Sequence, residues 1–155
     1  MVRLGLIGDT QGRYRVDVLL RAVEPHFRDV DEVWHAGDWQ WPEVLEGLRR
    51  FGKPLVVVNG NAPDDDAFPT YIVRQVEGVR MGMTHYPPRG DEHWLAGCQV
   101  VIHGHTHRWR DEVVQGVRYI NVSTPTAAGF SRDRTIGVLT VDGANVGLTK
   151  VNLSV

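Results

Sequence analysis

The sequence predicts a single α/β domain that spans residues 1–155, on the strength of three observations. The length suits one ordinary domain. The first half alternates short apolar runs with amphipathic helical stretches, a pattern typical of a parallel sheet with both faces covered. The second half consists mainly of strand-like hairpins, and the sequence contains no repeat, low-complexity segment or linker.

Strand and helix alternate through the first half of the chain. The predicted strands are residues 2–8, 31–36 and 54–58. The first helix has one apolar stripe, which consists of Val16, Leu19, Leu20, Val23 and Phe27. Pro25 should end or bend this helix early, and Pro42 opens a second helix that Gly52 closes. Right-handed crossovers would place the three strand ends at one edge of the sheet.

The second half is predicted to be mainly antiparallel. Its strands are residues 71–76, 79–84, 99–103, 112–114 and 117–121, followed by a hairpin over 136–152. The turns of these hairpins are Glu77-Gly78, Gln115-Gly116 and Asp142-Gly143. A short helix is predicted over 91–96, just before the strand that leads into a histidine-rich segment.

Composition and charge exclude several classes of protein. A net charge of −2 and a pI near 6.4 leave no basic face for binding nucleic acid. The apolar runs are too short to cross a membrane, and no signal-peptide pattern precedes the first strand. The single Cys98 rules out an intramolecular disulfide and favours a reducing compartment. We therefore expect a cytoplasmic domain without a membrane partner.

Histidines alternate in the segment Val101-Ile102-His103-Gly104-His105-Thr106-His107. An extended backbone would place the three imidazoles on one side, and Gly104 permits a sharp turn or a close approach. Imidazole is the commonest metal ligand among side chains, whereas chance clustering is the alternative in a chain with seven histidines. Further candidate ligands at the ends of other strands would favour a metal site over chance clustering.

Polar side chains do follow the other predicted strands. They are Asp9, Asp38, Asn61 and His85, and His105 and His107 complete the set. In open α/β sheets ligands bind beyond the carboxyl ends of the strands, so these side chains can meet in one pocket. Alone, each has another explanation as a helix cap, a turn former or a residue that tolerates positive φ. Together, the two carboxylates, the amide and the three imidazoles exceed the needs of one tetrahedral ion and suit two ions that share a carboxylate.

Five ordered blocks carry a family resemblance: Gly8-Asp9-Thr10-Gln11-Gly12, Gly37-Asp38, Gly60-Asn61, Thr84-His85 and Gly104-His105-Thr106-His107. Together they resemble the calcineurin-like metallophosphoesterase superfamily, in particular its small one-domain prokaryotic branch. The resemblance implies a four-layer α-β-β-α sandwich of two mixed sheets with flanking helices. It also implies a dinuclear metal site at the carboxyl ends of the strands.

The resemblance further implies a role for each polar residue of these blocks. The implied metal ligands are Asp9, Gln11, Asp38, Asn61, His85, His105 and His107. Asp38 would bridge two divalent ions, with Asp9 and His107 on the first ion. The second ion would be held by Asn61, His85 and His105. Asp38, Asn61 and His85 would form the catalytic group. Manganese is the expected metal, with iron, zinc or nickel as alternatives.

Two positions depart from the family pattern. Gln11 stands where the family has a histidine, and because a neutral amide oxygen is the weaker donor, the first ion should be held less tightly. Ala62 stands where the family often has a histidine that assists the leaving group, so no proton donor is assigned there. The extra residue in Ala62-Pro63-Asp64, compared with the family's Gly-Asn-x-Asp, leaves Asp64 without an assigned role.

The residues and the resemblance together predict a metal-dependent phosphoesterase, and more specifically a phosphodiesterase. A metal-bridging hydroxide would attack phosphorus in line, and diesters with good leaving groups suit a site without an acid. One alternative is an interaction scaffold with a weakened site, as in a subunit of the retromer coat that resembles this family. Another is a mononuclear zinc hydrolase that uses the imidazoles alone, which leaves Asp9 and Asn61 unexplained.

Residues close to the blocks are the candidates for binding the substrate, a phosphate-ester small molecule or a nucleotide. These candidates are Arg13, Arg89, Asn121 and Ser123. Trp39, Trp41 and Trp109 either stack on a base or aryl group or pack within the fold. His35 and His103 are expected to pack or make hydrogen bonds behind the site rather than bind metal.

Overall fold

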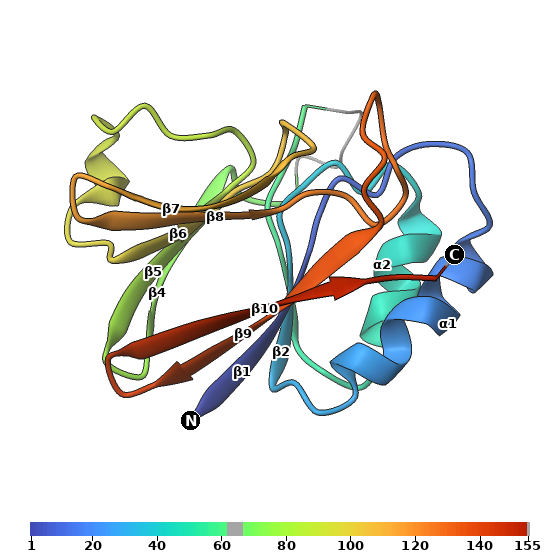
Figure 1. The fold of residues 1–155 in the computed structure, drawn as a ribbon, viewed down its shortest axis with the longest axis horizontal. Coiled ribbons are helices and arrows are strands. Elements are labelled where there is room, and N and C mark those ends of the chain that lie inside the picture. The colour runs from blue at the N-terminus through green and yellow to red at the C-terminus, as the bar shows by residue number, and fades with distance from the viewer. Residues whose placement is uncertain (62–66, 155) are drawn as a thin grey trace.

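The apolar runs and helical stretches fold into two five-stranded sheets that face one another (Figure 1). The computed structural model describes residues 1–61 and 67–154. The first sheet has the strand order β10-β9-β1-β2-β3, and the second has the order β4-β5-β6-β8-β7. Both sheets contain parallel and antiparallel pairs, so the predicted α/β class with two mixed sheets is confirmed.

The first sheet places three strand ends at one edge. Its parallel strands are β1 (Val2–Ile7), β2 (Glu32–His35) and β3 (Leu55–Val57). They are joined by α1 (Val16–Phe27) and α2 (Pro42–Arg49), which cover the same outer face of the sheet (Figure 1). The hairpin of β9 (Thr135–Asp142) and β10 (Asn145–Asn152) extends the sheet beyond β1 in antiparallel fashion.

The second sheet brings two further strand ends together. It consists of β4 (Tyr71–Val76), β5 (Val79–Thr84), β6 (Val100–Ile102), β7 (Trp109–Val114) and β8 (Val117–Val122). β6 lies between β5 and β8 and is parallel to both. The segments that leave β5 and β6 therefore emerge side by side, which places the segment after Thr84 next to the histidine run.

Helix α1 continues beyond the proline that interrupts its pattern. It runs through Pro25 to Phe27, so the prediction that Pro25 ends the helix early is wrong. A proline in the last turn removes one backbone hydrogen bond, and burial of Val23 and Phe27 against the sheet compensates for that loss. None of the helices in residues 1–61 and 67–154 is long and apolar enough to cross a membrane.

Among the described residues, the two largest hydrophobic clusters lie one on each side of the first sheet. Leu4, Leu6 and Trp34 of this sheet point toward the second sheet, where they meet residues such as Met81 and Ile120. On the opposite face, Ile7, Val33 and Val138 contact the apolar stripes of α1 and α2. Because both faces are covered there, β1 and β3 are apolar at nearly every position, which is the pattern seen in the sequence.

The outer face of the second sheet is covered by a short 3₁₀-helix and its flanking loops. This helix, η1 (His93–Leu95), falls within the predicted short helix over 91–96 but is only 3 residues long. Leu95 and the unpaired, buried Cys98 pack against Val101 and Tyr119 of the sheet. The fourth layer of the sandwich is therefore thinner than the pair of α-helices on the first sheet.

Candidate metal centre

Two carboxylates and an imidazole meet where strands of both sheets end. Asp9 follows β1, Asp38 follows β2, and His85 follows β5. One ligand atom from each lies within 4.8 Å of the others, and all three side chains are buried. This is the gathering of polar residues at strand ends that the sequence pattern predicts.

Four further predicted ligands surround this group. Gln11 Nε2 donates to Asp38 Oδ2 at 3.0 Å, and His107 Nε2 lies 3.4 Å from Asp9 Oδ1. The side-chain amide of Asn61 contacts His85 Nε2 at 2.8 Å and His105 Nδ1 at 3.3 Å. All seven side chains that the sequence singles out as metal ligands therefore lie in one cluster.

The atoms that converge in this cluster are rich in lone pairs. The amide atom of Asn61 that faces the cluster lies 2.7 Å from Asp38 Oδ2 and 2.8 Å from His85 Nε2. If that atom is the amide nitrogen, it donates to both of these neighbours. If it is the oxygen, a proton on His85 Nε2 or a cation between the groups relieves the repulsion. Among residues 1–61 and 67–154, no hydrogen bond reaches the buried Asp9 Oδ1 or Gln11 Oε1. Buried acceptors without donors, next to imidazoles and carboxylates, fit divalent metal ions.

Backbone carbonyls orient two of the imidazoles toward the carboxylates. His85 Nδ1 lies 2.8 Å from the carbonyl oxygen of Ala36, and His107 Nδ1 lies 3.1 Å from that of Ala128. When Nδ1–H donates to these carbonyls, each Nε2 directs a lone pair at the cluster. A hydrogen bond of this kind behind a ligand is the usual way in which proteins fix a metal-binding histidine.

The electrostatics of the cluster favour a positive charge. The Asp9 carboxylate, 3.4 Å from the ring, raises the pKa of His107 against the opposing effect of burial. For His85, burial is the largest single influence and works against the charged ring. The hydrogen bond to Asp38 and the charges of Asp9 and Asp38 together outweigh it, so the pKa of His85 is raised. Protons and metal ions therefore compete for the same pocket.

The backbone at the ligands is held in an unusual conformation. Asp9, Asp38, His105 and His107 have φ angles of +50°, +57°, +74° and +57°. Residues other than glycine seldom adopt this region, and they do so mostly at functional sites where the surroundings impose it. The left-handed turn after each strand redirects the chain just where a ligand side chain enters the cluster.

Two buried histidines support the cluster from behind. His35 Nδ1 accepts a hydrogen bond from the Gly37 backbone N–H at 3.1 Å, and its Nε2 lies 3.1 Å from Thr10 Oγ1. His103 Nδ1 contacts the carbonyl oxygen of Gly104 at 3.0 Å, and its Nε2 lies 3.0 Å from Arg110 Nη1. The prediction that both rings pack and make hydrogen bonds behind the site is confirmed.

Acid should destabilise the fold through His35. Burial, aided by the charge of His85, lowers the pKa of His35 to about 3, whereas the unfolded chain titrates near 6.5. The unfolded state therefore binds the extra proton, and the stability contribution of the neutral ring, present above pH 6.5, is lost as the pH falls. Between pH 6 and 4.5 this effect should lower the free energy of unfolding of the wild type by about 1.4 kcal/mol per pH unit. We expect the His35→Asn variant to lack this part of the pH dependence.

Chemical denaturation at a series of pH values measures this slope. His26→Asn, at an exposed position of α1, is the matched control and should leave the slope unchanged. An NMR titration of the wild-type protein checks the same point without a variant. A His35 ring that takes up a proton at pH 6 would contradict the expectation.

Two of the predicted substrate-binding residues lie behind the histidine segment. Asn121 is buried, and its Nδ2 donates to the Gly104 carbonyl at 3.1 Å and to Thr106 Oγ1 at 3.0 Å. Ser123 Oγ lies 2.8 Å from the His107 carbonyl oxygen and 2.7 Å from Asp133 Oδ2. Both residues therefore hold the segment that carries His105 and His107.

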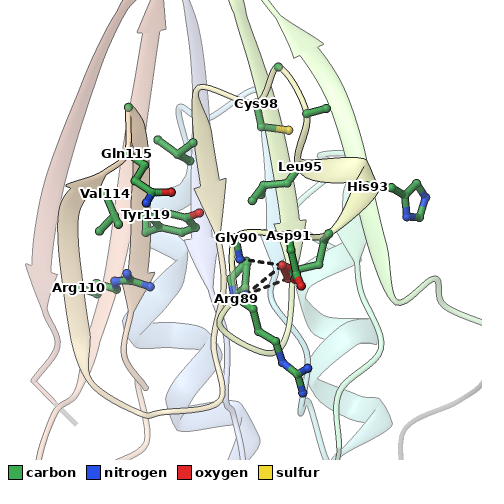
Figure 2. A pocket seen from close by; sticks show the side chains of 16 residues that line it. Arg89, Gly90, Asp91, His93, Leu95, Cys98, Arg110, Val114, Gln115 and Tyr119 are labelled. Atoms are coloured by element: carbon green, nitrogen blue, oxygen red, sulfur yellow. Dashed lines mark hydrogen bonds between the residues drawn. The ribbon is translucent and has the colours of Figure 1, made fainter.

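The two predicted substrate-binding arginines are exposed. Arg13 lies in the loop that carries Gln11, whereas Arg89 lines a cavity of about 580 Å³ on the outer face of the second sheet (Figure 2). The backbone N–H of Arg89 donates to the Glu92 carboxylate at 3.0 Å. Arg110 and Tyr119 line the same cavity, and none of the seven predicted metal ligands is among its described lining residues. Ala62 and Asp64 lie outside the described residues.

The loop over residues 123–134 belongs to the site, although the sequence pattern does not single it out as a whole. Thr124 Oγ1 donates to the Asp9 carbonyl at 2.8 Å, and Thr126 Oγ1 donates to the Gln11 carbonyl at 2.6 Å. The Ala128 carbonyl of the same loop orients His107. The only local signal is a run of hydroxyl side chains after a strand, which is also common in ordinary turns.

Comparisons with known protein sequences point to one family. A family model described as the calcineurin-like phosphoesterase superfamily domain matches residues 2–144. A probable metallophosphoesterase from Methanothermobacter thermautotrophicus is 32% identical over 150 residues, which covers 90% of this chain and 86% of that protein. A probable metallophosphoesterase from Methanocaldococcus jannaschii is 31% identical over 132 residues, covering 79% of this chain and 68% of that protein.

Solved structures share the fold. An archaeal phosphodiesterase aligns with a TM-score of 0.79 at 19% identity, over 97% of this chain and 100% of that one. Vps29 from Entamoeba histolytica, solved in complex with zinc, aligns with a TM-score of 0.74 at 19% identity, over 97% of this chain and 99% of that one. At this level of identity, the likeness shows the fold alone.

Proposed function

We propose that this chain, which belongs to the calcineurin-like phosphoesterase superfamily, is a metal-dependent phosphodiesterase. The observation that carries the proposal is the buried cluster of Asp9, Asp38 and His85, with four further donor side chains around it. A pair of divalent cations, when bound, supplies Lewis acidity and lowers the pKa of a water molecule so that hydroxide is available near neutral pH. Manganese is the metal we propose, with iron, zinc or nickel as alternatives.

The ligands divide into two groups by their positions. Asp38 is central, because its Oδ2 contacts both Gln11 Nε2 at 3.0 Å and His85 Nε2 at 3.2 Å. Asp9 and His107 form a pair at one end of the cluster, and Asn61 joins His85 and His105 at the other. We propose that two ions would share Asp38 and that each end of the cluster would supply the remaining side-chain ligands of one of them.

Gln11 makes the two ends unequal. Its side chain lies beside Asp38, and rotation of the amide would turn the buried Oε1 toward the cluster in place of Nε2. A neutral amide oxygen binds transition metals less strongly than an imidazole. We therefore infer that the ion at the Asp9–His107 end is held more weakly than the ion at the His85–His105 end.

The chain's own residues would hold the cations that bind the phosphate. Asp9, Asp38 and His85 are buried, so the carboxylates act in a medium of low dielectric, where they attract a cation strongly. Ala62 replaces the histidine that serves the leaving group in many relatives of this family. Diesters whose leaving group needs no protonation, such as aryl esters, are therefore the substrates we propose. The general likeness to the fold of an archaeal phosphodiesterase agrees with this choice.

An interaction scaffold of the same fold is the second candidate. The departure at Gln11 favours it, because loss of one imidazole weakens the first metal position. The fold is also shared with Vps29, a vacuolar protein sorting protein. A scaffold would bind at most one ion tightly, whereas the enzyme requires two.

Metal titration combined with an activity assay tests the proposal. Calorimetric titration of the metal-free protein with Mn²⁺ should show two binding steps of unequal affinity. Hydrolysis of bis(p-nitrophenyl) phosphate should rise with occupancy of the weaker step. One tight step without turnover, or binding of no ion, would overturn the phosphodiesterase and support the scaffold.

The setting of the reaction is also a proposal. The free, buried Cys98 fits a reducing compartment, and we propose the cytoplasm as the place of action. The partner we propose there is a phosphate-ester small molecule or a nucleotide.

A further inference from the structure

We propose that Phe130 is an aromatic platform beside the metal centre that binds the planar ester group of the substrate. The inference rests on the proposed phosphodiesterase function and adds a substrate class to it, namely diesters with one flat aromatic group. Three observations carry it: the full exposure of the Phe130 ring, the anchoring of its loop to the metal ligands, and a hollow that Phe130 shares with His107.

Phe130 stands out among the large apolar side chains. It is fully exposed, whereas Trp34 and Phe27 are fully buried. A single exposed apolar residue is common on protein surfaces, and exposure alone says little. The position of Phe130 is what matters, because its loop touches three of the predicted metal ligands.

The loop over residues 123–134 determines where the backbone of Phe130 lies. Thr124 and Thr126 hold the backbone carbonyls of Asp9 and Gln11, and the Ala128 carbonyl contacts His107 Nδ1. The chain then passes so close to His107 that a Cβ at Gly129 would lie 2.9 Å from the Nδ1 of that ring. Phe130 is the next residue and lies two positions after Ala128, whose carbonyl contacts the His107 ring, so its backbone is held close to that ring.

A hollow lies between Phe130 and His107, the one predicted metal ligand in its described wall. It has a volume of about 410 Å³, and its wall includes His107, Arg108, Trp109 and Phe130. Pockets for small ligands commonly measure about 300–1,000 Å³, so the hollow suits an aromatic ring with its linking atoms. A phosphate held at the cluster would direct one ester group past His107 into this space.

The chemistry of the wall selects a flat aromatic group. An aromatic ring stacks on Phe130 with little change in the protein, because the loop is already ordered by its hydrogen bonds. The exposed guanidinium of Arg108 can lie over the face of the same ring or contact the phosphate. Trp109 is partly buried with Lys150 Nζ 4.9 Å from its ring centroid, so it supplies a fixed wall rather than a second platform.

Two stable phosphonates test the proposal without turnover. Phenylphosphonate and methylphosphonate share one head group, and only the former has a ring. Calorimetry on the Mn²⁺-loaded protein should show phenylphosphonate binding about tenfold more tightly. Phe130→Ala should abolish this advantage and leave the affinity for methylphosphonate unchanged, and Phe130→Tyr should restore it. Val113→Ala, at an exposed apolar position of β7, should have no effect.

Each outcome of this experiment has a distinct meaning. Failure of both phosphonates to bind would overturn the proposed function, and the inference with it. Binding of methylphosphonate without an advantage for the phenyl compound would overturn the inference alone. An equal loss of affinity for both compounds in Phe130→Ala would also overturn it, because Phe130 would then act on the geometry of His107. If phenylphosphonate still binds more tightly than methylphosphonate in Phe130→Ala, its phenyl ring binds elsewhere, and the inference is overturned.

Discussion

Asp38→Asn is expected to lower the metal-dependent hydrolysis of an aryl phosphodiester by about 10³-fold or more. Asp38 is almost completely buried, and its carboxylate contacts both Gln11 and His85. An amide has nearly the same shape but no charge, so it cannot balance two cations from a bridging position. The variant should bind fewer ions than the wild type, which elemental analysis of the dialysed protein measures directly.

The same variant should fold normally without metal. In the metal-free state Asp38 is a buried carboxylate close to Asp9, an arrangement that costs free energy unless a cation is present. We expect the unfolding free energy of D38N to lie within about 1 kcal/mol of the wild type in the presence of a chelator.

Added metal should then stabilise the wild type more than it stabilises D38N. An ion at 100 times its Kd would stabilise the wild type by about 2.7 kcal/mol, and the gain in D38N should be much smaller. Asp29→Asn, at an exposed position after α1, controls for the change in net charge. Turnover in D38N equal to that of the wild type would show that Asp38 is not part of the catalytic group.

Gly104→Ala is expected to weaken metal binding by about 10–100-fold, although Gly104 has no side chain to bind a metal. A Cβ at this position would lie 2.8 Å from Asp9 Oδ2, and 3.4 Å from both His85 Nδ1 and the carbonyl oxygen of Ala36. Asp9 Oδ2 also accepts the His105 backbone N–H at 3.1 Å, so it cannot retreat without losing that bond. The added methyl group therefore displaces a ligand from the cluster.

The cost of G104A in stability should be smaller than its cost in metal affinity. Overpacking of this kind lowers the unfolding free energy by about 1–3 kcal/mol, which thermal unfolding in chelator measures. Gly116→Ala is the matched control. Gly116 has φ +80° in the turn between β7 and β8, and a Cβ there would have no heavy atom within 4 Å outside its chain neighbours. This control should lose stability and keep its metal affinity, and equal loss of metal affinity in both variants would contradict the steric account.

The ends of the strands were the most predictable part of the molecule. β1 and β3 are mostly apolar, and β2 contains the buried pair Val33 and Trp34, so the polar residues soon after each strand stand out. These residues are Asp9, Asp38 and Asn61. Parallel pairing then carries these side chains to one edge without further information. For this reason the local sequence predicts that these side chains meet at one site.

Other features depend on contacts that the sequence pattern does not display. The extension of α1 beyond Pro25 rests on burial of Phe27, and the shortness of η1 rests on how Leu95 meets the second sheet. Asn121 could face either substrate or backbone, and only the position of the Gly104 carbonyl decides. The loop that carries Phe130 has no periodicity at all, so its anchoring to Asp9 and Gln11 is visible only in three dimensions.

The bond between His105 N–H and Asp9 Oδ2 joins residues that are 96 positions apart. A ribosome releases Asp9 long before His105, and the loop over residues 123–134 emerges later still. A nascent chain therefore cannot sequester cations at this place while translation continues. With the proposed function, loading with metal would be a step that follows synthesis, and a loaded site would require that both sheets have docked.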